Sequence, residues 1–318
     1  MRLFIHIGWP KTGSTALQAF CAAHPAQLAA HGVQYYRNRK NLPALNALAK
    51  DIRQGRDMTA ERAAFAAWCD AAVGDKVLIS AEQFATLDPA QLARVIAPER
   101  WERVTVIAYL RAQEAVLEGW YKQLVKWGNR LSLRDFLRQL TTFSDVEYAA
   151  HLGRWQAWCD GLPGGEMQVR LFERAALVGG DIGADMFATM GLTDPALRAG
   201  RDNPSPSAPL VELYLKLPEI KSLQKINRIM VASEHPAATG SGDLFSAELV
   251  TQIRRRFAPS NETVRARYFP ARETLFAAPE PRATGPEETD GLADLLIETL
   301  RVERGEAVAD AARRAFAE

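Results

Sequence analysis

An apolar run of strand length leads into a glycine-containing turn and then a helical pattern near the amino end of the chain. Residues 4–15 read FIHIGWPKTGST, and helical spacing of apolar residues begins at Ala16. A strand that feeds a helix through such a turn directs backbone N–H groups and the positive helix end at one point. Lys11 adds a mobile positive charge with three N–H donors. The sequence therefore predicts a binding site for a phosphate or sulfate group.

The two commonest nucleotide-binding loops do not match this segment. The nucleoside-triphosphate loop reads G-x-x-x-x-G-K-[ST], with lysine directly after the second glycine. Gly8 and Gly13 keep the four-residue gap, but Ser14 occupies the lysine position and Lys11 lies inside the loop. The dinucleotide fingerprint G-x-G-x-x-G is also missing from this segment. The lysine therefore approaches a bound anion from a different side than in a nucleoside-triphosphate loop.

The loop resembles that of the sulfotransferases that use 3′-phosphoadenosine 5′-phosphosulfate (PAPS), which commonly reads P-K-[TSA]-G-[ST]-[TS]. His-Ile-Gly before the loop and Ala-Leu-Gln after it are similar to bacterial carbohydrate sulfotransferases. The resemblance implies that Lys11 is catalytic. It also implies that six residues bind the 5′-phosphosulfate of the donor: Pro10, Lys11, Thr12, Gly13, Ser14 and Thr15.

A second match follows the apolar run at 104–110. That run ends at Arg111, whose planar guanidinium can hold a phosphate through two hydrogen bonds. In the PAPS families this arginine and a serine eight residues later bind the 3′-phosphate, and here Gly119 stands at the serine position. The missing hydroxyl would weaken binding by about 1.5–3 kcal/mol unless water, Lys122 or Gln123 replaces it. The resemblance implies that Arg111 and the backbone near Gly119 bind the donor.

Two further titratable residues lie near predicted strand ends. Glu82 follows the strand at 76–80 and is a candidate base for the proton of an acceptor hydroxyl. The alternative is a helix cap or an ion pair, for example with Arg111. His6 lies within the first apolar run, where it is either a buried core histidine or a catalytic one.

Alternating strand and helix patterns predict an α/β fold with a doubly wound, mainly parallel sheet flanked by helices, the P-loop-like fold of the sulfotransferases. The predicted strands are 3–7, 76–80, 105–110 and 168–172. The predicted helices include 60–72, 112–127 and 210–217. Helix-end signals lie at Asp88, Ser132 and Gly191. We assign residues 1–270 to this domain.

The remainder, 271–318, reads as a proline-rich linker with Pro270, Pro279, Pro281 and Pro286 around it, followed by a C-terminal helical tail. Residues 291–316 form an amphipathic helical pattern that needs a surface to pack on. That surface is either the chain's own core or a second subunit, so a homo-oligomer through the tail is possible.

Two later segments extend the resemblance. Residues 201–207, RDNPSPS, look like the family's Arg-x-Asn-x-Ser element, or they form a plain turn with a helix cap. Ser260-Asn261 and the pattern ending at Tyr268 are similar to a closing family signature. Arginines at 254–256 and Arg265 form either a basic wall for the nucleotide or a solvated helix face.

Composition fits an enzyme without a nucleic-acid or membrane partner. The 318 residues are 47% hydrophobic with a net charge of +1, so any positive field is local. Three distant cysteines predict reduced thiols and a cytoplasmic protein. No run approaches the roughly 18 apolar residues of a transmembrane helix, and the amino end does not read as a signal peptide.

The sequence thus predicts a sulfotransferase that moves a sulfuryl group from PAPS to a hydroxyl of a saccharide or glycoconjugate. The product of the donor is adenosine 3′,5′-bisphosphate (PAP), and no metal is required. Two alternatives stay open. One is a nucleotide-dependent kinase with a P-loop, and the other is a catalytically inactive nucleotide-binding module.

Overall fold

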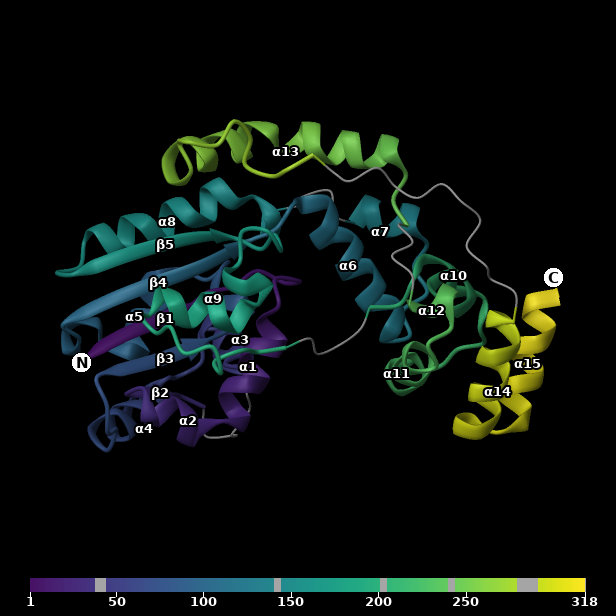
Figure 1. The fold of residues 1–318 in the computed structure, drawn as a ribbon, viewed down its shortest axis with the longest axis horizontal. Helices are drawn as coiled ribbons and strands as arrows, with labels where there is room; N and C mark the ends of the chain where they lie inside the picture. The colour runs from purple at the N-terminus through teal and green to yellow at the C-terminus, as the bar shows by residue number, and fades with distance from the viewer. Residues whose placement is uncertain (38–43, 140–143, 201–204, 240–243, 279–290, 318) are drawn as a thin grey trace. The chain divides into compact units, whose positions relative to one another are not determined.

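The computed structural model describes residues 1–37, 44–139, 144–200, 205–239, 244–278 and 291–317. The chain forms two compact units (Figure 1). The first contains residues 1–112, 144–202 and 257–276. The second contains residues 113–143, 203–256 and 277–318.

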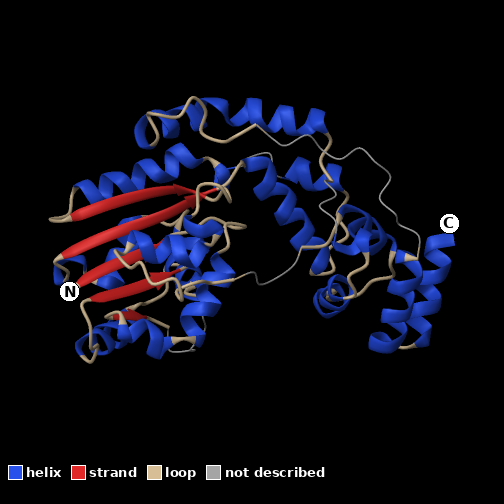
Figure 2. Cartoon of the chain, in the orientation of Figure 1, coloured by secondary structure: helices blue, strands red, loops and turns tan. Residues whose placement is uncertain are grey.

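A parallel five-stranded sheet forms the centre of the first unit, as the red arrows of Figure 2 show. Its strand order is β2-β3-β1-β4-β5, and every neighbouring pair is parallel. The strands are β1 (Arg2–His6), β2 (Val33–Tyr35), β3 (Lys76–Ser80), β4 (Arg103–Leu110) and β5 (Gly165–Leu171). The predicted α/β doubly wound fold is confirmed. Only the short β2 was not predicted.

Helices cover this sheet, and the hydrophobic core lies beneath them. Helix α1 (Ser14–Ala23) and helix α9 (Ile182–Thr189) pack over Phe4, Leu78 and Ile107 on one face. Helix α8 (Tyr148–Asp160) packs against β4 and β5. The connection that contains α1 runs toward β2, and the connection that contains α8 runs toward β5. Connections between parallel strands are right-handed, so two that run in opposite directions lie on opposite faces of the sheet. By this rule α1 and α8 cover opposite faces.

Two of the helix-end signals in the sequence are confirmed in this unit. Asp88 accepts a hydrogen bond from the Ala90 amide and caps α5, and Gly191, in the left-handed region at φ 81°, follows α9. The remaining helical segments are α2 (Pro25–Ala30), α3 (Asn46–Arg53), α4 (Thr59–Asp70), α5 (Pro89–Ile96) and the short 3-10 helix η1 (Glu82–Phe84). The three cysteines are buried and form no disulfide.

Strand β1 is the point at which the winding direction reverses. The connection after β1 leads to β2 at one edge, whereas the connections after β3 and β4 lead toward β5 at the other edge. Loops that leave neighbouring strands toward opposite faces open a crevice at their carboxyl ends, where ligands of doubly wound folds bind. The loop between β1 and α1 lies at this position.

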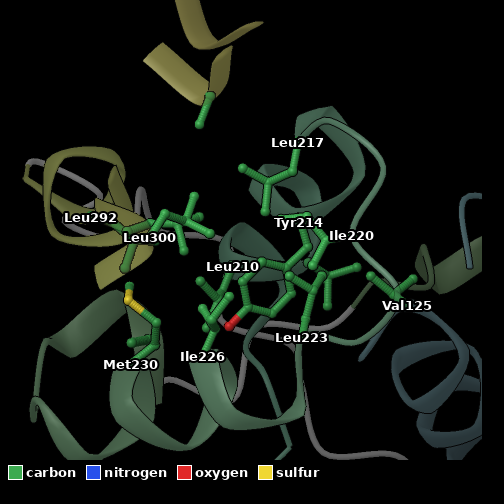
Figure 3. Close-up of a cluster of buried hydrophobic side chains, with 14 of the residues drawn as sticks. Val125, Leu210, Tyr214, Leu217, Ile220, Leu223, Ile226, Met230, Leu292 and Leu300 are labelled. Carbon is green, nitrogen blue, oxygen red and sulfur yellow. The ribbon is translucent and has the colours of Figure 1, made fainter. Parts of the chain in front are cut away.

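The second unit is helical and has its own core, shown in Figure 3. Its helices are α6 (Gln113–Lys126), α7 (Leu133–Gln139), α10 (Ala208–Lys216), α11 (Gln224–Ala232), α12 (Pro236–Thr239), α14 (Leu292–Arg304) and α15 (Glu306–Ala317). Helix α13 (Ala247–Tyr268) contributes to both units.

The C-terminal tail packs on its own chain. Leu292 and Leu300 lie in one buried cluster with Leu210, Tyr214 and Ile226 (Figure 3). The predicted tail helix is confirmed as two helices, which Gly305 separates with a φ of 94°. The prolines at 279, 281 and 286 lie outside the described residues. In the described part of the chain, none of the helices combines the length and the apolar character that crossing a bilayer requires.

Candidate anion-binding site

The loop between β1 and α1 holds three residues with positive φ. Gly8 has a φ of 28°, Lys11 of 67° and Gly13 of 76°. A left-handed conformation costs a residue with a side chain about 1–2 kcal/mol, so Lys11 is held there by its surroundings. Backbone strain of this kind concentrates at ligand-binding sites.

Buried contacts fix the loop from within. Trp9 is fully buried, and its Nε1 donates a hydrogen bond to the Asp145 carbonyl over 2.7 Å. The hydroxyl of Thr12 donates to the Trp9 carbonyl over 2.6 Å, and the Tyr148 ring meets Trp9 edge-on at 4.9 Å between centroids. The Thr12 hydroxyl is therefore used inside the loop.

Helix α1 begins directly after Gly13. Gly13 is the N-cap and supplies no side-chain hydrogen bond to the first turn, and α1 has no acidic residue in that turn. The first amide groups of a helix lack intrahelical partners and carry partial positive charge. The amino end of α1 is thus a positive pole that follows Lys11 closely in the chain, and no carboxylate of its own first turn offsets it.

Arg111 lies next to the loop, as the strand topology predicted. It directly follows β4, and its Nη1 donates a hydrogen bond to the Lys11 carbonyl over 2.9 Å. Its guanidinium lies 5.7 Å from the centre of the Phe172 ring, within cation–π range. A Cβ on Gly13 would lie 2.8 Å from the same ring. Phe172 therefore packs both the arginine and the glycine, a role that the sequence analysis missed.

Glu82 interacts with both Lys11 and Ser14. Burial raises the pKa of the Glu82 carboxyl above its usual value, while the Lys11 charge and a hydrogen bond with the Ser14 hydroxyl act in the opposite direction. The charged partner of Glu82 is thus Lys11, where the sequence analysis named Arg111 as an example. A raised carboxyl pKa is what a base near neutral pH requires.

A buried polar cluster lies under the loop. His6 is the last residue of β1 and is fully buried, and its Nδ1 lies 2.8 Å from Ser80 Oγ. The Gln18 amide donates to the same Ser80 oxygen over 3.0 Å. Burial lowers the pKa of His6 to about 3, so the ring is neutral at physiological pH. His6 is therefore a buried neutral residue that links β1, β3 and α1.

The residues predicted for the 3′-phosphate fall in two units. Arg111 belongs to the first unit, and Gly119 lies on α6 in the second. Tyr121, also on α6, is buried in the core of the second unit, and its hydroxyl donates to the Leu131 carbonyl. Lys122 forms an ion pair with Glu118 over 2.9 Å. Tyr121 therefore has a structural partner for its hydroxyl.

The later family-like segments have structural partners too. Ser207 caps α10 by accepting from the Leu210 amide, which supports the helix-cap interpretation of that segment. Residues 201–204 lie outside the described part of the chain. Arg254 pairs with Glu114, and Arg265 forms two hydrogen bonds with Glu262. The Ser260 hydroxyl accepts from the Ala149 amide.

Of the three residues that hold the loop, Phe172, Trp9 and Asp145, only Trp9 is marked by the sequence alone. Phe172 follows β5 and so lies at the same sheet edge as the loop, a position that strand order predicts once the sheet is known. Trp9 lies inside the loop motif itself. The Asp145 carbonyl is 136 residues away in sequence from Trp9, and nothing local marks that contact.

Comparison with known proteins leaves the family open. No family model matches the chain. An uncharacterised protein of Archaeoglobus fulgidus is 24% identical over 200 residues, which cover 61% of this chain and 54% of the archaeal protein. The chain thus matches about half the length of that relative.

Proposed function

We propose that the protein is a sulfotransferase that moves a sulfuryl group from PAPS to a hydroxyl group, most simply of a saccharide or glycoconjugate. One observation carries the proposal. Lys11 has a left-handed conformation near the positive end of α1, its carbonyl accepts a hydrogen bond from Arg111, and its charge acts on the Glu82 carboxyl, whose pKa is raised. This arrangement combines an anion cradle, a phosphate-binding arginine and a base at one sheet edge.

The loop offers a fit for the 5′-phosphosulfate. Gly13 has no Cβ, and a Cβ there would collide with Phe172, so the glycine lets that ring pack directly against the start of α1. The amides of residues 12–15 and the Lys11 ammonium would bind the sulfate and phosphate oxygens. Arg111 would hold the 3′-phosphate and thereby fix the register of the donor.

Lys11 and Glu82 would divide the chemical work. Lys11 supplies positive charge where negative charge grows on the oxygen that leaves sulfur. Glu82 accepts the proton of the acceptor hydroxyl as that oxygen attacks sulfur. The adjacent lysine also lowers the cost of the Glu82 charge, because opposite charges within a few ångströms favour each other. Positioning of the two reactants would supply much of the rate.

One contact favours a second candidate, a P-loop kinase. In nucleoside-triphosphate loops a Ser or Thr and a carboxylate together hold Mg²⁺. Ser14 follows Gly13 and is hydrogen-bonded to Glu82, so a hydroxyl and a carboxylate lie together here too. The lysine position of that loop is nevertheless occupied by Ser14 itself. This candidate predicts a response to ATP with Mg²⁺ and none to PAP.

A melting-temperature series tests the proposal. Saturating PAP, at about 100 times its dissociation constant, should stabilise the protein by about 2.7 kcal/mol. ATP or GTP with Mg²⁺ should have a much smaller effect. Stabilisation by ATP with Mg²⁺ alone would support the kinase. Stabilisation by PAP without sulfuryl transfer from PAPS to any of a panel of saccharides would indicate an inactive binding module.

A further inference from the structure

The unsatisfied nitrogen of His6 lies at the base of the loop. Among the buried side-chain nitrogen and oxygen atoms of the described residues, only His6 Nε2 and Glu114 Oε2 have no hydrogen-bond partner. Leaving a buried polar atom unpaired costs about 1–3 kcal/mol. An arrangement of the same residues that gives Nε2 a partner would recover part of that cost.

A polar group of the loop, the Ser14 hydroxyl, lines the same small space as this nitrogen. A Cβ built on Gly8 would lie 3.0 Å from His6 Nε2 and 2.9 Å from Ser14 Oγ. Both atoms therefore line the space that Gly8 leaves by having no side chain. The Tyr109 ring lies edge-on to His6 at 5.8 Å between centroids and closes another side.

The hydrogen bonds around Ser80 favour a proton on Nε2. Gln18 donates to Ser80 Oγ, and Tyr35 also forms a hydrogen bond with Ser80. When both of these groups donate, the Ser80 hydroxyl proton is directed to His6 Nδ1. The neutral ring then carries its own proton on Nε2. In this tautomer Nε2 is a hydrogen-bond donor, and it lines the space beside Gly8.

The Ser14 hydroxyl has one proton to donate and more than one acceptor within reach. Its hydroxyl is hydrogen-bonded to Glu82 and lies 3.3 Å from the Thr12 hydroxyl. A bound phosphate or sulfate oxygen above the amino end of α1 would compete with Glu82 for that proton. Once Ser14 turns to the anion, its lone pair can accept from His6.

We propose that His6 is a positioning residue for the anion site, and that its Nε2–H donates to Ser14 Oγ when Ser14 donates to a bound phosphate or sulfate oxygen. The inference rests on the proposed function only for the identity of the ligand, which would be PAPS or PAP. The hydrogen bond itself requires only that an oxyanion binds in the loop. It also removes the Ser14 hydrogen bond from Glu82, so that the carboxylate becomes a stronger base when the donor binds.

A matched pair of substitutions separates the two nitrogens of His6. His6→Asn keeps a polar atom near the Nδ1 position and removes Nε2, whereas His6→Gln places an amide nitrogen near the Nε2 position. We expect His6→Asn to weaken PAP binding about tenfold in calorimetry, and His6→Gln to retain most of the affinity. In a Ser14→Ala background, His6→Asn should weaken binding no further, because the two residues act through one hydrogen bond. An undiminished effect in that background would overturn the inference.

Nuclear magnetic resonance of the ¹⁵N-histidine-labelled wild type decides the question even if a His6 variant does not fold. Adding PAP should move the Nε2 resonance of His6 in the wild type and leave it unmoved in Ser14→Ala. An unmoved resonance in the wild type, with PAP bound, would contradict the inference alone. If PAP does not bind, the proposed function fails. The same comparison of wild type and Ser14→Ala is then made with inorganic phosphate in place of PAP. No shift with either anion would overturn the inference too.

Discussion

Lys11 has a left-handed backbone conformation, which is unfavourable for a residue with a side chain. Asparagine adopts the left-handed region far more readily than lysine. Lys11→Asn therefore removes the positive charge and keeps the backbone conformation of the loop. We expect Lys11→Asn to be at least as stable as the wild type and to lose sulfuryl transfer. Lys50→Asn, at an exposed position on α3, is the control and should retain activity. Normal transfer by a folded Lys11→Asn protein would exclude the lysine from the reaction.

Gly13 combines a positive φ with a close approach to Phe172. Gly13→Ala should lower the free energy of unfolding by about 2–3 kcal/mol, through left-handed strain and the 2.8 Å collision, and should weaken PAP binding. Gly55→Ala is the matched control, because Gly55 has a φ of 67° and its Cβ would meet no atom within 4 Å. Chemical denaturation should show a loss of about 1 kcal/mol for the control. Equal losses in the two variants would mean that Phe172 does not constrain the loop.

Glu82 should make stability and activity depend on pH in opposite senses. Its pKa is raised above the model-compound value of 4.5, so the folded state binds the proton more tightly than the unfolded state. The folded state therefore loses relative stability as pH rises from about 4.5 through the raised pKa. Glu82→Gln should remove this loss, so its advantage in melting temperature over the wild type should grow across that interval.

Sulfuryl transfer by the wild type should rise over the same pH interval, since the base acts as the carboxylate. Glu82→Gln should abolish the rise and most of the activity. Glu99→Gln, at an exposed position, should behave as the wild type in both measurements. A Glu82→Gln protein with the wild-type pH profile would show that another group takes the proton.

At the scale of elements, a buried carboxylate fixes α9 to the sheet. Asp185 is fully buried and accepts from the Tyr109 hydroxyl, from Arg170 and from the Val178 amide. Asp185→Asn leaves the arginine without its charged partner and should cost about 3–5 kcal/mol in the free energy of unfolding. Tyr109→Phe removes one hydrogen bond to the charged carboxylate and should cost less, about 1.5–3 kcal/mol. Comparable losses for the two variants in urea denaturation would contradict this ranking.

Most elements were predictable because their cause is local. β1, β3 and β4 are continuous apolar runs, and the carboxyl ends of parallel strands share one edge, so Lys11, Glu82 and Arg111 were expected to lie together. The short strand β2 was missed because its three residues carry too little pattern to distinguish a strand.

The contacts that hold the site had no local signal. Phe172 reaches Gly13 across the sheet edge, and the Asp145 carbonyl reaches Trp9 from a distant segment. His6 could be predicted as buried but not as unsatisfied, because that depends on Ser80 and Gln18. Such pairings become visible only when the strand order and the packing of α1 are known.

At the scale of the whole molecule, the chain alternates between two compact units. Each unit is built from three segments, and the core of the second joins α10 and α11 to the tail helices. A composition change near residue 270 marks the linker in the sequence. Composition does not mark the points at which the chain passes from one unit to the other and back.

Two units with separate cores predict two unfolding transitions in calorimetry. Leu300→Ala, in the core of the second unit, should lower one transition at a cost of about 2–5 kcal/mol. Phe187→Ala, in the core of the first unit, should lower the other by about 3–5 kcal/mol. A single transition that both substitutions lower would show that the units unfold as one.

The central claim is that the loop of residues 8–15 binds the phosphosulfate end of PAPS. The most direct measurement is a crystal structure of the protein with PAP. The account predicts the 5′-phosphate on the amides at the start of α1, with Lys11 and Arg111 in contact with the nucleotide. A nucleotide bound elsewhere, with this loop vacant, would contradict the account.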